Sequence, residues 1–274
     1  MRLALAVQTP DVSLSLPIAL LSGTWPEKVD KAARLGVDGL ELMTADPGRL
    51  DAGEIRGTLE ARGLSVVAIG SGAAAMQAGL NLLHVDPAVA ERAVKRLDEL
   101  IEFAATVGAP LVTLGSFRGK LASVGAGGRS RLIEILRRAG GHAAAAGVRL
   151  ALEPLNRYEA DLINTAEQGL EFVEDVGHPA LGLLLDTYHV NIEETSWEAP
   201  FRILMQAKRL WHIHLGDNNR LPPGRGMIDF AALLRTLRSL GYDQALSAEL
   251  LALPDPDTAA RQTVEFMRPL LEAA

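Results

Sequence analysis

The chain has 274 residues and no cysteine, so neither a disulfide nor a thiolate zinc site can form. Hydrophobic residues make up 48% of it, enough for a large buried core, and its length suits one α/β barrel or two ordinary domains. The formal net charge of −7 argues against a nucleic-acid partner, because a polyanion calls for a basic surface.

The N-terminal segment carries one arginine followed by apolar residues. Gln8, Pro10 and Asp11 interrupt the apolar run, so we expect no signal peptide and predict a first strand at Leu3–Val7. No stretch of about 18 or more apolar residues occurs, so we expect no membrane span. The expected compartment is the cytoplasm.

Short apolar runs alternate with longer amphipathic runs along the chain, without a linker or a low-complexity break. Each short run is rich in Val, Leu or Ile, as a strand buried on both faces should be. The short runs predict eight strands, at Leu3–Val7, Gly39–Leu42, Ser65–Ile69, Pro110–Leu114, Val148–Leu152, Leu181–Leu185, Leu210–Leu215 and Ala245–Ala248.

The longer runs predict helices at Thr24–Leu35, Ala52–Ala61, Pro87–Val107, Arg129–Ala146, Thr165–Asp175, Ser196–Lys208, Asp229–Leu240 and Asp257–Leu271. Several are followed by a glycine that allows a tight return into the next strand, as at Gly36 and Gly108. This βα rhythm predicts a single (β/α)8 TIM barrel over residues 1–274. An open doubly wound sheet is the alternative, although no G-x-G-x-x-G follows the first strand.

Four consecutive predicted strands end in side chains that can ligate a metal, namely Glu153, Asp186, His214 and Glu249. In a parallel barrel the carboxyl ends of the strands meet on one face, where active sites lie. Three crowded carboxylates would repel one another without a cation, and this oxygen-rich set suits Mn²⁺, Mg²⁺ or Co²⁺. The pattern predicts one divalent metal, with solvated strand-end charges as the alternative.

Alternation along the seventh strand predicts that His212 and His214 point into the barrel while Trp211 and Ile213 face the helices. His214 lies nearer the carboxyl end and is the expected ligand. His212 lies one layer deeper, where a substrate contact, support for the ligands or an ordinary buried histidine are all open.

Three further polar side chains, Glu159, His189 and Arg220, follow the expected ligands in the strand-to-helix loops. Arginine and histidine at such positions can hydrogen-bond sugar hydroxyls or an oxyanion. A loop salt bridge, such as Arg220 with Asp217, is the alternative interpretation.

Four segments carry a resemblance to a known family: Glu153–Glu159, Asp186–Glu194, His212–Arg220 and Ser247–Glu249. They resemble the xylose-isomerase-like TIM-barrel superfamily, and within it the D-tagatose/D-psicose (allulose) 3-epimerases and the L-ribulose 3-epimerases. Gly224–Phe230 is similar to the glycine-rich segment before the family's seventh helix. The similarity is strong from about Leu150 to Leu250, and the N-terminal half matches mainly in its barrel rhythm.

The resemblance implies that Glu153, Asp186, His214 and Glu249 hold one divalent cation, Mn²⁺ before Mg²⁺ or Co²⁺. It implies that Glu153 and Glu249 are the acid/base pair. It also implies that Glu159, His189 and Arg220 hold a small sugar. His212, from its place in the strand, is a further expected substrate contact. In that family aromatic residues from early strands line the far end of the sugar, and the corresponding segments here are Ala6–Thr9 and Gly115–Arg118. Related enzymes are homodimers or homotetramers, so we expect a homo-oligomer.

The expected reaction is epimerisation of a free ketose at C3 through an enediolate. Two carboxylates on opposite faces would take and return the proton, whereas return to the neighbouring carbon would give aldose–ketose isomerisation. Hydroxypyruvate isomerase and keto-inositol dehydratase are alternatives in the same superfamily. A DNA-binding endonuclease IV type and a non-catalytic sugar-binding barrel are rivals that the acidity and the complete ligand set disfavour.

Overall fold

The computed structural model describes residues 1–273, in which eight parallel strands close into a barrel. Strand order follows chain order, and β8 pairs with β1 from Arg2–Ala245 to Leu5–Ala248. The strands are β1 (Arg2–Gln8), β2 (Gly39–Met43), β3 (Ser65–Gly70), β4 (Leu111–Leu114), β5 (Arg149–Leu152), β6 (Leu181–Asp186), β7 (Leu210–Leu215) and β8 (Ala245–Ala248). The predicted (β/α)8 fold is confirmed.

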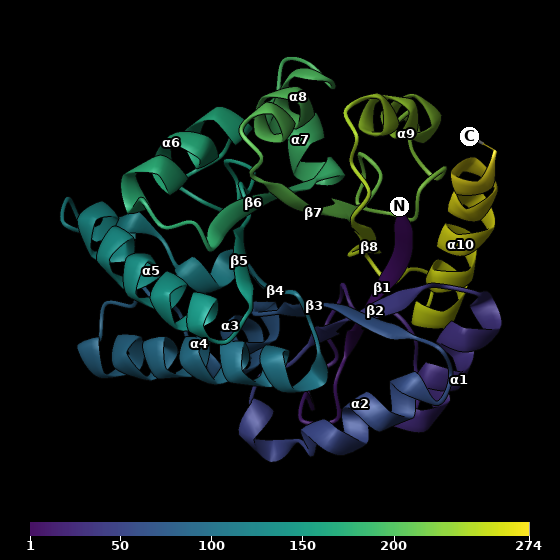
Figure 1. Cartoon of the computed structure of the whole chain (residues 1–274), viewed down its shortest axis with the longest axis horizontal. Helices are drawn as coiled ribbons and strands as arrows, with labels where there is room; N and C mark the ends of the chain where they lie inside the picture. Colours follow the sequence, from purple (N-terminus) through teal and green to yellow (C-terminus); the bar gives the residue numbers. More distant parts are fainter. Residues whose placement is uncertain (274) are drawn as a thin grey trace.

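Helices connect successive strands and cover the outside of the barrel (Figure 1). The eight predicted helices correspond to α1 (Trp25–Leu35), α2 (Ala52–Glu60), α4 (Pro87–Val107), α5 (Gly128–Ala145), α6 (Ala166–Val176), α8 (Ala199–Gln206), α9 (Phe230–Ser239) and α10 (Pro256–Glu272). Two short helices that the sequence did not predict follow strands directly, α3 (Gly72–Ala78) and α7 (Thr187–Glu193). Single 3₁₀ turns lie at Pro47–Arg49, Ser116–Arg118 and Leu121–Ser123.

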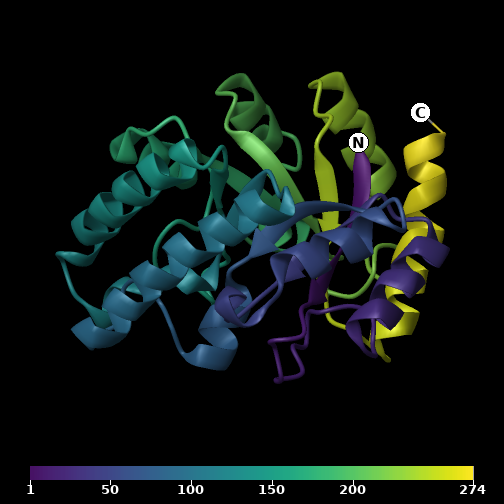
Figure 2. The same ribbon diagram turned by 60° about the horizontal axis from the view of Figure 1, so that its bottom comes forward.

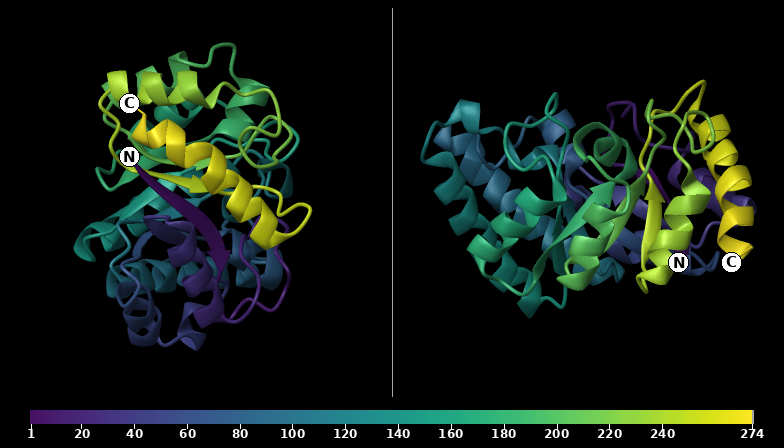
Figure 3. Two further views of the ribbon diagram at one scale, coloured as in Figure 1. Left: turned by 90° about the vertical axis from the view of Figure 1, so that its right-hand side faces the viewer. Right: turned by 90° about the horizontal axis from the view of Figure 1, so that it is seen from above.

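Local signals set the helix ends. Asp86 and Asp229 cap α4 and α9 by accepting the backbone N–H of Ala88 and Ala232. Gly36 follows α1 with φ 73° and Gly108 follows α4 with φ 76°, a left-handed conformation that turns the chain back towards the next strand. In Figure 2 the loop between β1 and α1, in purple, projects beyond the strands. Figure 3 shows α10 beside β1, with the two ends of the chain close together.

Alternation along the strands separates two apolar regions. Residues such as Leu3 and Leu5 pack outwards against the helices. Inward residues near the amino ends of the strands form an apolar floor: Ala4, Val67, Ala68, Leu111, Ala151, Leu184, Trp211 and Ala245. The inward polar residues therefore gather towards the carboxyl ends. Within the described residues, no helix combines the length and the apolar character needed to cross a bilayer.

Trp211 corrects one expectation, since it belongs to this floor and does not face the helices. The register between β6 and β7 shifts after Leu183, so that Leu183 pairs with Leu210 and Leu184 with His212. Trp211 has no partner there and turns inwards over Gly182, where a Cβ atom would lie 2.6 Å from its ring. The glycine therefore makes room for the indole.

Candidate metal centre and sugar site

Glu153, Asp186, His214 and Glu249 meet at the carboxyl ends of β5, β6, β7 and β8, and we call these four residues the centre. Each offers one ligand atom, and these atoms all lie within 4.8 Å of one another. Nδ1 of His214 is 3.5 Å from Oε1 of Glu153 and 3.6 Å from Oε2 of Glu249. The four residues predicted from the ends of consecutive strands thus lie together in the structure.

The unpartnered atoms of the centre test whether a cation fits. Within residues 1–273, Oε1 of Glu153, Oδ2 of Asp186 and Nδ1 of His214 are buried without a hydrogen-bond partner. Buried polar atoms are almost always paired, so three that converge on one point indicate a missing charge. Three carboxylates and one imidazole match the ligand preferences of Mn²⁺, Mg²⁺ or Co²⁺. The residues present fit a single divalent cation.

The carboxylates of the centre carry shifted pKa values. Burial, together with the Glu153 carboxylate, raises the pKa of Asp186 to about 8 although Arg220 opposes the shift. Burial likewise raises the pKa of Glu249 to about 7. Burial also works on Glu153, but its contact with His214 outweighs that effect and holds the pKa of this carboxyl below its usual value. Without a cation, the centre therefore holds protons at neutral pH.

His189, on α7, points a second imidazole at the centre. Its Nε2 atom lies 3.8 Å from Oε1 of Glu153 and 3.8 Å from Oδ2 of Asp186. Burial lowers the pKa of His189 to about 4, so the ring is neutral. The Asn156 side chain lies 2.8 Å from the other ring nitrogen, Nδ1.

Arg220 and Glu159, from the loops after β7 and β5, form an ion pair beside the centre. Nη1 of Arg220 is 3.2 Å from Oε1 of Glu159, and Nη2 is 3.6 Å from Oε2 of Glu249. The guanidinium also lies 5.0 Å from the centroid of the Tyr188 ring. Asp217 instead accepts backbone N–H groups of Gly224 and Gly226, so the alternative Arg220–Asp217 bridge does not form.

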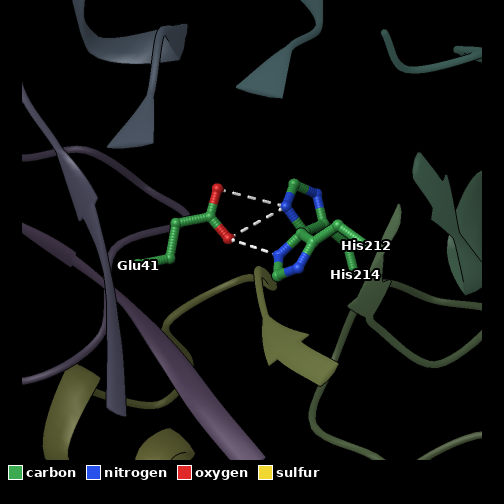
Figure 4. A group of neighbouring side chains, drawn as sticks. All are labelled: Glu41, His212 and His214. Carbon is green, nitrogen blue, oxygen red and sulfur yellow. Dashed lines mark hydrogen bonds and ion pairs between the residues drawn. The ribbon is translucent and has the colours of Figure 1, made fainter. Parts of the chain in front are cut away.

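Glu41, on β2, is a functional candidate that the sequence analysis missed. Its Oε2 atom lies 3.0 Å from Nε2 of His212 and 3.1 Å from Nε2 of His214, as Figure 4 shows. Thr113 donates a further bond of 3.2 Å to Oε1. Burial alone would raise the pKa of Glu41, but the charge of His214 and the bonds from both histidines hold it well below its usual value.

This contact also places His212. The ring is 1% exposed and its Nε2 atom is engaged by Glu41. The signal that could have found Glu41 is a lone carboxylate in the middle of an apolar strand, Gly39–Met43. A buried carboxylate needs hydrogen-bond partners, and only inward-facing polar residues of other strands can provide them.

A cavity of about 150 Å³ opens beside Glu153 and Glu249 and is also lined by Glu159 and Arg220. Its remaining wall is made by Pro17, Ile18, Gly72, Met76, Thr113, Gly115, Ser116 and Leu155. Of the two segments that correspond to the family's aromatic wall, Ala6–Thr9 and Gly115–Arg118, only Gly115 and Ser116 line this cavity. Phe117 and Arg118 are buried beneath the loops, and Gln8 bonds to the β1–α1 loop, which itself supplies Pro17 and Ile18.

The chain matches the sequence profile of the xylose isomerase-like TIM barrel family over residues 29–270. It belongs to this family. It is 36% identical over 218 residues to L-ribulose 3-epimerase of Mesorhizobium japonicum, covering 78% of this chain and 71% of the relative. It is 30% identical over 218 residues to ketose 3-epimerase of Arthrobacter globiformis, covering 78% and 73%. A solved structure of L-ribulose 3-epimerase is 28% identical with a TM-score of 0.80, covering 98% of this chain and 94% of that one. The resemblance seen in the sequence is confirmed.

Proposed function

We propose that this protein is a divalent-cation-dependent 3-epimerase of free ketoses. The observation that carries the proposal is the pair Glu153 and Glu249, which line one small cavity and both approach Nδ1 of His214. The pair comes from β5 and β8, with β6 and β7 between them. Relatives that are 36% and 30% identical are named as L-ribulose and ketose 3-epimerases, which supports this reaction over others.

Glu153, Asp186, His214 and Glu249 would hold the cation, for which we propose Mn²⁺. Once bound, it supplies positive charge that acidifies the C–H group beside the ketose carbonyl and stabilises the enediolate. Glu153 and Glu249 are the acid/base pair, one taking the C3 proton and the other returning a proton to the opposite face. Stereochemistry at C3 inverts because the proton leaves from one face of the planar enediolate and another is added to the opposite face.

Three residues around the pair hold the sugar. Arg220 and Glu159 line the cavity and bind hydroxyl groups of the sugar. Arg220 also places positive charge near the enediolate oxygens. His189 directs Nε2 towards the same point. His212 has no part in sugar binding in this proposal, because Glu41 engages it.

Solvent-exchange NMR tests the reaction directly. The Mn²⁺-loaded protein would be incubated in D₂O with L-ribulose, D-tagatose, D-fructose and hydroxypyruvate, and deuterium located after removal of the metal. Deuterium at C3 together with the epimeric ketose is expected. Exchange at C1 with aldose formation would replace the proposal by an isomerase. Absence of exchange in every ketose by a loaded protein would overturn it.

Two variants make this experiment specific. Glu249→Gln keeps the size of the side chain but removes the base, so it should abolish exchange at C3. Glu265→Gln is the matched control, because Glu265 is an exposed glutamate of α10 that pairs with Arg261. Undiminished exchange in the Glu249 variant would remove this carboxylate from the mechanism.

We also propose that the protein assembles as a homodimer or homotetramer. The support is that three large apolar side chains of strand-to-helix loops, Tyr158, Met227 and Leu253, are 78%, 88% and 53% exposed. Light scattering on a sizing column measures the mass. Tyr158→Asp with Met227→Glu should reduce an oligomer to monomers, and a monomeric wild-type protein would exclude the assembly.

A further inference from the structure

Two histidines aim opposite ring atoms at one point. His214 presents Nδ1, 3.5 Å from Oε1 of Glu153, whereas His189 presents Nε2, 3.8 Å from the same oxygen. A neutral imidazole carries one N–H group and one lone pair, so each ring can offer either a ligand atom or a hydrogen-bond donor. The partner of the outer nitrogen decides which one reaches the centre.

The outer nitrogen of His214 faces a carboxylate. Its Nε2 atom lies 3.1 Å and 3.2 Å from the two oxygens of Glu41, and His212 approaches the same group at 3.0 Å. An ionised carboxylate only accepts hydrogen bonds, so Nε2 of His214 must carry the proton. Nε2 therefore keeps its proton in any state of the ring, and when a cation is bound Nδ1 is the nitrogen that would offer a lone pair to it.

The outer nitrogen of His189 faces two donors from Asn156. The backbone N–H of Asn156 lies 3.3 Å from Nδ1, and the side-chain Nδ2 lies 2.8 Å from it. The side-chain amide of Asn156 cannot be flipped without losing two hydrogen bonds, because its Oδ1 accepts from the N–H of Tyr158 and its Nδ2 donates to Glu159. Nδ1 of His189 is thus an acceptor, and Nε2 carries a proton into the centre.

We propose that Glu41 and Asn156 are positioning residues that give the two histidines different chemistry. Glu41 makes His214 a lone-pair donor for the cation. Asn156 makes His189 a hydrogen-bond donor for an oxygen of the sugar, and keeps it out of the metal's ligand set. The sugar half of this inference rests on the proposed epimerase function, whereas the cation half does not. Orienting partners of this kind commonly change metal affinity or activity by about 10–100-fold.

Replacement of Glu41 tests the cation half. Glu41→Met removes every acceptor, and Glu41→Gln keeps one neutral acceptor. Titration calorimetry with Mg²⁺ or Mn²⁺ should show affinity about 10–100-fold weaker in the Met variant and an intermediate loss in the Gln variant. Asp11→Asn is the matched control, because Asp11 is a buried carboxylate that accepts from Ala45 and Asp46, away from the centre. It should leave cation affinity unchanged.

Replacement of Asn156 by Asp tests the sugar half. An aspartate accepts from Nδ1 of His189, so the ring moves its proton outwards and presents a lone pair to the centre. Cation affinity should stay equal or increase, while kcat for the ketose falls about 10²–10³-fold, the usual cost of one missing donor to an oxyanion. Asn164→Asp is the matched control, since Asn164 bonds to Leu155 and Ala160 in the same loop and does not contact His189.

Histidine ¹⁵N spectra report which ring nitrogen carries the proton. A purely structural role of Glu41 or Asn156 would not change that position. In the Mg²⁺-loaded wild-type protein both rings should carry the proton on Nε2. Glu41→Met should let it shift to Nδ1 of His214 alone, and Asn156→Asp should shift it in His189 alone. A proton on Nδ1 of His214 in the Mg²⁺-loaded wild-type protein would overturn the inference. So would equal cation loss in both variants, or two cations per chain with one between Glu41 and the histidines.

The two proposals fail in different ways. If the spectra and the calorimetry agree with expectation but no ketose exchanges deuterium, the positioning of His214 by Glu41 stands and the 3-epimerase reaction falls. If exchange occurs at C3 but neither variant changes the spectra, the reaction stands and the positioning falls.

Discussion

A Cβ atom on Gly115 would lie 2.4 Å from Oε2 of Glu153. Glycine at the end of β4 is therefore what lets Glu153 reach the centre. Gly115→Ala should displace the carboxylate and lower kcat/KM about 10²-fold, the usual cost of misplacing a catalytic group by about 1 Å. Urea unfolding should change little. Gly127→Ala is the control, since no atom lies within 4 Å of its added Cβ. Full activity in the Gly115 variant would contradict the close contact.

Removal of the cation should change how stability depends on pH. The folded, metal-free protein raises the pKa of Asp186 to about 8 and that of Glu249 to about 7, above the unfolded values near 4. Raised pKa values stabilise the fold fully below about pH 4, and that contribution is lost as pH rises towards 8.

The melting temperature gained on adding Mn²⁺ should therefore grow between pH 6 and pH 8, because the cation replaces protons that leave anyway at high pH. Scanning calorimetry with and without chelator measures it. The same linkage predicts more protons released on binding at pH 6.5 than at pH 8.5. A gain independent of pH would contradict these shifts.

Arg220 should set the pH range of activity as well as sugar affinity. Its guanidinium lies 3.6 Å from Glu249, and its charge lowers the pKa of Glu249 and of Asp186. Arg220→Met should thus raise both pKa values and move the acidic limb of the pH–rate profile upwards, with a higher KM. The exposed Arg225 of the same loop provides the control, Arg225→Met. An unshifted limb would show that Arg220 acts on the sugar alone.

Arg118 should matter for stability, because it joins two loops beneath the centre. It is 1% exposed and donates to the backbone carbonyls of Glu153, Leu162 and Ile163. Arg118→Met leaves these acceptors buried and unpaired, so the free energy of unfolding should fall by roughly 3 kcal/mol. Cation affinity should fall too, because the bonded segment carries Glu153. The exposed pair of Arg129 with Asp175 provides a control, since Arg129→Met should cost less than about 1 kcal/mol.

The strands and the four residues of the centre could be predicted from the sequence because each depends on a local signal. Buried strands are short apolar runs, and a polar residue directly after such a run must lie at the carboxyl end. Prediction of Glu153, Asp186 and Glu249 as ligands requires only that strands consecutive in the chain are neighbours in the barrel. His214 follows from alternation within its own strand.

The rest depends on contacts between distant parts of the chain. Glu41 meets His212 and His214 only because the barrel closes. The sequence of β2 does not indicate that its single carboxylate has hydrogen-bond partners on β7. Trp211 turned inwards because of a register shift between strands that periodicity cannot show. The helix α7 was missed because its N-cap, Asp186, is also the last residue of β6, so no turn residues separate the strand from the helix.

Asp186 divides its two oxygens between two tasks. Oδ1 accepts the N–H of Tyr188 and so begins α7, the helix that carries His189, while Oδ2 is directed into the centre. An engineer who wished to change the metal preference by exchanging this aspartate for glutamate would lengthen the side chain by one methylene, and a single group could then no longer reach both places. A change of this ligand would therefore also disturb the start of α7 and the position of His189. The metal ligand at this position cannot be changed independently of that helix.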